Sequence, residues 1–158
     1  MNKYMKEADK LARDNLKTNA GGPFGAVVVK DGEIVGRGSN HVLAYTDPTA
    51  HAEVTAIRDA CKNLGTHDLS GCEIYTTCYP CPMCISAIIW ANIKKVYYGN
   101  TKDDAAKIGF RDAFIYDYLE KLNKNVKDNE TLELLKLDRD ETIECFNMFN
   151  EKSDKTIY

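Results

Sequence analysis

Pro80-Cys81-Pro82-Met83-Cys84 is the stretch around which this chain is organised. Proline suits the first turn of a helix, where its missing N–H costs no hydrogen bond, so we expect a helix over residues 82–91. Cys81 and Cys84 then lie on one face of that helix, near the positive end of its dipole, where thiolates are stabilised. Two thiolates placed in this way form half of a metal site.

His51 is the best candidate for the other half. It lies in Thr49-Ala50-His51-Ala52-Glu53, at the start of a second predicted helix that runs to about residue 65. One His and two Cys give a zinc ion three protein ligands and leave a fourth position for water, as in catalytic rather than structural sites. Glu53, two residues beyond His51, is placed to carry protons during hydrolysis.

Composition limits the class of protein further. The chain has 158 residues, so we expect one domain over residues 1–158. No apolar run approaches the ~20 residues that span a bilayer, and the charged N-terminus is unlike a signal sequence. Six cysteines without a disulfide pattern suit a reducing compartment, so we expect a cytoplasmic protein that does not bind membranes.

The charge distribution argues against a nucleic-acid partner. Residues 111–158 hold 8 basic and 12 acidic side chains, a net charge of −4, and the whole chain carries −3. Residues 1–110 therefore carry only one surplus positive charge. Neither part has the basic surplus that phosphate binding requires.

Hydrophobic periodicity predicts an α/β domain. Before the zinc motifs we expect an amphipathic helix over residues 3–17 and a hairpin of strands over 24–30 and 33–38, with a polar loop from 39 to 48. After them, strands at 72–77 and 94–98 flank the cysteine helix, and a short helix precedes Gly109. Residues 131–137 fit an edge strand or a helix, and residues 141–151 fit a helix.

Several motifs resemble the cytidine deaminase-like superfamily of zinc-dependent nucleobase deaminases, whose signature is H-x-E followed by P-C-x-x-C. Within that superfamily the chain is most similar to the bacterial guanine deaminases. The stretches that carry the resemblance are Gly21-Gly22-Pro23-Phe24-Gly25-Ala26-Val27, Asp47 to Glu53, Pro80 to Cys84, Gly109-Phe110-Arg111-Asp112, Phe114-Ile115-Tyr116 and the terminal Tyr158.

The resemblance implies a set of functional residues. His51, Cys81 and Cys84 would bind one zinc ion per subunit, and Glu53 would be the catalytic proton shuttle. Because His51 and Glu53 recur in the superfamily signature, this part of the assignment rests on residue spacing as well as on resemblance.

The substrate residues rest on the resemblance alone. It implies that Asn40 and Ala52 contact the base, that Phe24 stacks near it, and that Asp112 binds the purine and assists the departure of ammonia. Tyr158 would form part of a lid. Without the resemblance, Asp112 is a surface or capping carboxylate and Asn40 is a turn residue.

The resemblance also implies a fold and an assembly. The expected fold is a three-layer α/β/α architecture with a five-stranded mixed sheet, in which an antiparallel hairpin is followed by parallel strands. Residues 141–158 would form a lid segment exchanged between the subunits of a homodimer. One departure is Tyr79, since related deaminases often have an acidic residue there, and this change puts the surroundings of Cys81 in doubt.

Other interpretations of the cysteines compete with the zinc site. An iron–sulfur run through Cys78, Cys81 and Cys84 needs a further cysteine at position 88, which is Ile88. A redox pair at Cys78 and Cys81 leaves His51 unused. His41 and His67 have no other potential metal ligand at a suitable spacing in the sequence, so we interpret them as solvated loop residues.

Three functional hypotheses remain. The first is hydrolysis of guanine, a small-molecule nucleobase, to xanthine and ammonia. The second is deamination of cytosine or of adenosine in transfer RNA. The third is a zinc-stabilised interaction module without catalysis, in which Cys78 or His41 would complete a closed four-ligand site.

Overall fold

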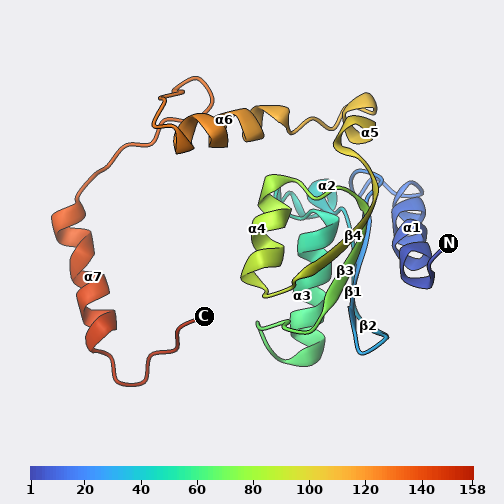
Figure 1. Ribbon diagram of the computed structural model, residues 1–158, viewed down its shortest axis with the longest axis horizontal. Helices are drawn as coiled ribbons and strands as arrows, with labels where there is room; N and C mark the ends of the chain where they lie inside the picture. The colour runs from blue at the N-terminus through green and yellow to red at the C-terminus, as the bar shows by residue number, and fades with distance from the viewer. The chain divides into compact units, whose positions relative to one another are not determined.

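The computed structural model describes residues 1–158 and contains a four-stranded mixed sheet (Figure 1). Its strands are β1 (Gly25–Lys30), β2 (Glu33–Ser39), β3 (Glu73–Cys78) and β4 (Lys95–Asn100), in the spatial order β2-β1-β3-β4. Strand β1 is antiparallel to both of its neighbours, whereas β3 and β4 are parallel.

The predicted hairpin is confirmed. Asp31 and Gly32 form its two-residue turn with positive φ angles of 50° and 82°. Both positive angles are typical of a type I′ turn, whose twist matches that of the flanking strands. This turn fixes the register in which β1 and β2 pair.

Helices cover both faces of the sheet (Figure 1). Helix α1 (Lys3–Asn15) packs on one face, over Val27, Val29 and Tyr75. Helices α3 (Ala52–Leu64) and α4 (Pro82–Trp90) cover the other, where Val28 and Ile74 belong to the larger apolar core. Successive residues of a strand point to opposite faces, so both cores can share β1 and β3.

Close packing fixes α3 against β2. Ala52, Ala56 and Ala60 are fully buried at helical spacing and face two glycines of β2. A Cβ on Gly38 would lie 2.3 Å from the carbonyl oxygen of Ala52, and one on Gly36 would lie 2.4 Å from that of Ala56. The helix therefore approaches the strand as closely as backbone atoms allow, and this position determines where α3 begins.

The remaining elements are helices. They are α2 (Val42–Tyr45), α5 (Lys102–Lys107), α6 (Ala113–Asn123) and α7 (Arg139–Glu151). Contacts divide the chain into two units, Met1–Tyr116 and Asp117–Tyr158. None of the helices combines the length and hydropathy needed to cross a bilayer.

Two expectations need correction. The sheet has four strands and not five, because residues 131–137, the region considered for an edge strand or a helix, form neither. Leu134 and Leu135 are adjacent and both exposed, so the alternation that buries one face of a strand is absent there. The loop expected over residues 39–48 contains α2, whose first N–H is accepted by the Asn40 side chain.

Candidate metal centre and cavity

Two helix N-termini bring the predicted zinc ligands together. His51 is the N-cap residue of α3, Cys81 is the N-cap residue of α4, and Cys84 lies in the first turn of α4. Pro82 occupies the first turn of α4, as its fixed φ angle favours. The positive ends of both helix dipoles therefore point at the site, where they stabilise thiolates.

The distances fit a tetrahedral zinc ion. His51 Nδ1 lies 3.6 Å from Cys81 Sγ and 3.6 Å from Cys84 Sγ. A zinc ion with Zn–S bonds of about 2.3 Å and Zn–N bonds of about 2.0–2.1 Å places nitrogen and sulfur about 3.6 Å apart at tetrahedral angles. The three ligand atoms all lie within 4.8 Å of one another. The residues are thus arranged as zinc ligands.

The thiols are strongly polarised. A hydrogen bond from Cys84, followed by contact with His51, lowers the pKa of Cys81 to about 4 although burial opposes the shift. The same hydrogen bond with Cys81, together with burial, raises the pKa of Cys84. Cysteine binds a metal as the thiolate, so a divalent cation held by both sulfurs would displace their protons.

Glu53 lies beside this ligand set and is almost fully enclosed. Its side chain belongs to the first turn of α3 and is only 6% exposed. Thr76 Oγ1 donates to Glu53 Oε1 at 3.1 Å, and Cys84 Sγ donates to Oε2 at 3.4 Å. Burial raises the pKa of Glu53, so its carboxyl group holds a proton at higher pH than an ordinary glutamate.

A cavity of about 580 Å³ opens over the site. This volume suits a small-molecule ligand. The cavity is lined by the site residues His51, Glu53 and Cys81 and by Gly21, Gly22, Phe24, Asn40, Val42, Leu43, Pro48, Ala52, Cys78, Tyr79, Lys102, Ala105, Phe110, Arg111, Asp112 and Ile115. Four of the five predicted substrate residues, namely Phe24, Asn40, Ala52 and Asp112, are therefore brought together with the metal ligands.

Asn40 presents a polar group to the cavity. It is 5% exposed, and its Oδ1 accepts the N–H of Val42 at 3.1 Å. Its Nδ2 has no partner within the protein and can serve a ligand. Asn15 supports this position, since its own Nδ2 donates to the carbonyl oxygens of Gly22 and Asn40.

The opposite part of the lining combines aromatic and charged side chains. Phe24 and Phe110 meet edge to face, with centroids 4.9 Å apart. Asp112 is half-buried just before α6, where its carbonyl oxygen accepts the N–H of Ile115. The fifth predicted substrate residue, Tyr158, belongs to the second unit and is 85% exposed.

Lys102 lines the cavity with a positively charged side chain that the sequence analysis did not identify. Lys102 Nζ lies 4.3 Å from the ring centroid of Tyr116 and 5.2 Å from that of Tyr79. Tyr79, where the resemblance led us to expect an acidic residue, thus forms a cation–π contact with Lys102. Burial and the nearby Asp112 raise the pKa of Tyr116 to about 12, so its hydroxyl stays protonated.

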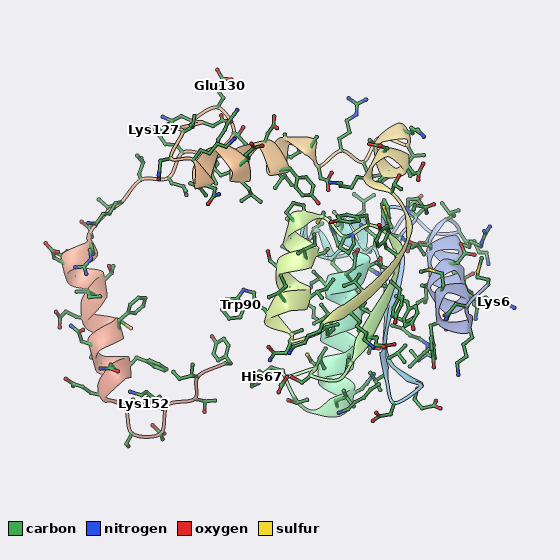
Figure 2. The ribbon with its side chains drawn as sticks, viewed as in Figure 1. Lys6, His67, Trp90, Lys127, Glu130 and Lys152 are labelled. Carbon is green, nitrogen blue, oxygen red and sulfur yellow. The ribbon has the colours of Figure 1, made fainter.

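The competing metal ligands lie apart from this set. Cys78 lines the cavity, but its Sγ is directed at the carbonyl oxygen of Thr101. His41 contacts the carbonyl oxygen of Ser39 through Nδ1 and stacks on Tyr45. His67 follows the C-terminal end of α3, at the far end of that helix from His51 (Figure 2).

Comparison with known proteins identifies the class. Residues 1–100 match the family described as the cytidine and deoxycytidylate deaminase zinc-binding region. The chain belongs to this family of zinc-dependent deaminases, as the paired motifs predicted.

Within this family, the chain is similar to deaminases that act on different substrates. Guanine deaminase from Bacillus subtilis is 53% identical over 118 residues, which is 75% of this chain and 76% of the relative. The X-ray structure of guanine deaminase from Bacillus subtilis has a TM-score of 0.91 at 44% identity and covers 100% of this chain and 99% of its own. The tRNA-specific adenosine deaminase of Aquifex aeolicus is 49% identical over 76 residues, 48% of this chain and 50% of its own.

Proposed function

We propose that this chain hydrolyses guanine to xanthine and ammonia. The observation that carries the proposal is that the His51, Cys81 and Cys84 set shares one cavity with a buried carboxyl group, an unpartnered amide and a second carboxylate. The relative named guanine deaminase, which resembles this chain over its whole fold, supports the choice of base.

Glu53 is the proton carrier in this proposal. A zinc ion held by the three ligands would supply the Lewis acidity that makes water nucleophilic near neutral pH. Glu53 accepts a proton from the attacking water and donates it to the ring nitrogen beside C2. It then takes the proton of the new hydroxyl group on C2 and delivers it to the departing amine, which leaves as ammonia while the C2–O bond becomes a carbonyl. Its raised pKa suits a group that must be both base and acid.

The remaining cavity residues bind and orient the base. Asn40 Nδ2 is a donor for a ring acceptor of the purine, and the Asp112 carboxylate accepts from N–H groups on another edge. Phe24 and Ala52, which also line the cavity, provide apolar contacts to the base. Fixing the base in one orientation places C2 at the reacting water and is a large part of the rate enhancement.

Deamination of adenosine in transfer RNA is the main rival. The tRNA-specific adenosine deaminases are 37–49% identical over 48–84% of this chain, whereas guanine deaminase is 53% identical over 75% of it. The structure of guanine deaminase has a TM-score of 0.91 with this chain, and that of a tRNA:A34 deaminase has 0.60. Residues 1–110 carry one surplus positive charge, which is little for binding an RNA backbone. We therefore favour a free base as the substrate.

A substrate panel tests the proposal. The zinc-loaded full-length protein is incubated with guanine, adenine, cytosine, their nucleosides and an RNA stem-loop containing adenosine, and released ammonia is measured. We expect ammonia and xanthine from guanine. Ammonia from the RNA alone would assign the chain to the rival class, and no ammonia from any substrate would favour an interaction module.

We further propose a homodimer in which residues 141–158 are exchanged, with residues 1–158 acting as one deaminase domain. Both units expose apolar side chains of a kind that assembly covers. In the first unit all six residues of β4 are exposed, and Trp90 at the end of α4 is 71% exposed (Figure 2). In the second unit Phe146, Met148 and Tyr158 are exposed on or after α7.

A mixing experiment tests the exchange. Chains lacking residues 154–158 are combined with full-length chains that carry Glu53→Gln, so that each homodimer lacks one part of the site. Recovered activity in the mixture requires the tail of one subunit to complete the site of the other. An active truncated protein would instead show that Tyr158 is not part of the site.

We also propose a cytoplasmic location. The six free cysteines suit a reducing compartment, which supports it.

A further inference from the structure

Thr76 is a polar residue in the apolar core below the cavity. It lies in β3 between Ala26 of β1 and Tyr98 of β4 and is 1% exposed. Its neighbour on the same face, Ile74, is fully buried in the core that α3 covers. A buried hydroxyl needs a hydrogen-bond partner, and the partner here is Glu53 Oε1, at 3.1 Å.

This contact makes the two oxygens of Glu53 different. Oε1 accepts a hydrogen bond from the hydroxyl group of Thr76, which lies on the central strand β3. Oε2 receives the Cys84 thiol, at 3.4 Å, and the backbone N–H of Glu53 also interacts with the carboxyl group. A thiolate that binds a metal has no proton to donate, so the loaded site leaves Oε2 without that contact and available to water and substrate.

We propose that Thr76 is a positioning residue for the deamination step, which anchors Oε1 of Glu53 and thereby reserves Oε2 for proton transfer. The inference rests on the proposed role of Glu53 as proton carrier. The terminal torsion of a glutamate is broad and has no strong preference of its own. Without the Thr76 hydroxyl, the carboxyl group rotates within its pocket and spends less time in the productive orientation.

The neighbouring threonine offers a matched control. Thr77 is 7% exposed on the opposite face of β3, and its Oγ1 accepts the N–H of Gly25 at 3.1 Å. Its hydroxyl therefore supports the backbone and not Glu53. Thr77→Val removes a buried threonine hydroxyl from the same strand without touching the proton carrier.

The experiment compares Thr76→Val, Thr76→Ser and Thr77→Val as zinc-loaded full-length proteins. Valine keeps the shape of threonine and loses the donor, whereas serine keeps the donor. We expect Thr76→Val to lower kcat for guanine by about 10- to 100-fold, the loss of a hydrogen bond to a charged group, with KM and zinc content near the wild-type values. Thr76→Ser should recover most of kcat, and Thr77→Val should lower Tm with little change in kcat.

The outcomes separate this inference from the proposed function. A wild-type protein that releases no ammonia from guanine overturns both. An active wild type with an equally active Thr76→Val variant overturns the role of Thr76 alone. Loss of zinc from Thr76→Val, or equal losses of kcat in Thr76→Val and Thr76→Ser, would make the residue part of the structural support and would also overturn the inference.

Discussion

Replacing Glu53 with glutamine is the most direct test of the chemistry. Glutamine has the shape of glutamate and keeps a carbonyl oxygen that can accept from Thr76, so the hydrogen bond at 3.1 Å survives. Glu53 is absent from the ligand set of His51, Cys81 and Cys84, so zinc binding should survive as well. The substitution therefore removes proton transfer and little else.

The expected loss follows from the role of the group. General acid–base catalysis by a positioned side chain contributes about 10²- to 10⁴-fold, which is roughly 3–5 kcal/mol of barrier. Glu53 acts on more than one proton in the proposed reaction and is 6% exposed, so bulk water has little access to replace it. We expect a loss of kcat towards the upper end of that range, about 10⁴-fold.

The assay measures ammonia release from guanine together with zinc content, and Glu33→Gln serves as the control because Glu33 is exposed in the hairpin. A Glu53→Gln protein that binds zinc and keeps kcat within about tenfold of the wild type would refute the role of Glu53, since even the weakest general acid contributes more. Loss of zinc would instead make Glu53 a ligand.

The same variant should also change how the free energy of unfolding of the metal-free protein depends on pH. Burial raises the pKa of Glu53, so the folded state disfavours its charged form. Its contribution to stability is complete below the unfolded-state pKa and is lost as the pH rises through the folded-state pKa. Glutamine does not titrate, so metal-free Glu53→Gln should lose less stability than metal-free wild type over that rise, as measured by denaturant unfolding at several pH values.

Three further predictions concern the residues around Glu53. Cys84→Ser should lose zinc and unfold at a lower temperature, whereas Cys78→Ser should keep its zinc by metal analysis, and equal loss from both would favour a four-ligand site. Asp112→Asn should impair kcat/KM for guanine by about 1–3 kcal/mol with zinc unchanged, since the amide puts a donor where an acceptor is needed, and unchanged kinetics would make Asp112 a surface carboxylate. Gly38→Ala should cost about 1–3 kcal/mol by denaturant unfolding and weaken zinc binding, because its Cβ would lie 2.3 Å from the Ala52 carbonyl oxygen. Gly65→Ala also lowers stability, since alanine is strained at a φ of 66°, but its Cβ would meet no other atom, so zinc binding should stay intact.

Local signals predicted most of the fold and the metal centre. Asp31 and Gly32 determined the hairpin through their positive φ angles, and Pro82 marked the start of α4. The spacing of Cys81 and Cys84 placed both sulfurs at one helix end. Each of these features depends on residues within a few positions of one another, so pattern and propensity are sufficient to find it.

Long-range contacts were less accessible to sequence reasoning. Thr76 lies 23 positions from Glu53, and nothing in Cys72-Glu73-Ile74-Tyr75-Thr76-Thr77 says which face of the strand meets α3. A threonine inside an otherwise buried strand was the available signal, because its hydroxyl must find a partner. The prediction of a fifth strand was wrong for a similar reason, because a strand forms only where another stretch of backbone pairs with it.

The glycines of β2 explain why a short motif is enough to specify the site. Gly36 and Gly38 allow α3 to lie against the strand through Ala52 and Ala56, which leaves the helix little freedom to slide or rotate. His51 directly precedes Ala52, so the contacts between α3 and β2 fix the position of its backbone. The candidate metal ligand His51 is thus positioned by glycine and alanine, the smallest residues in the chain.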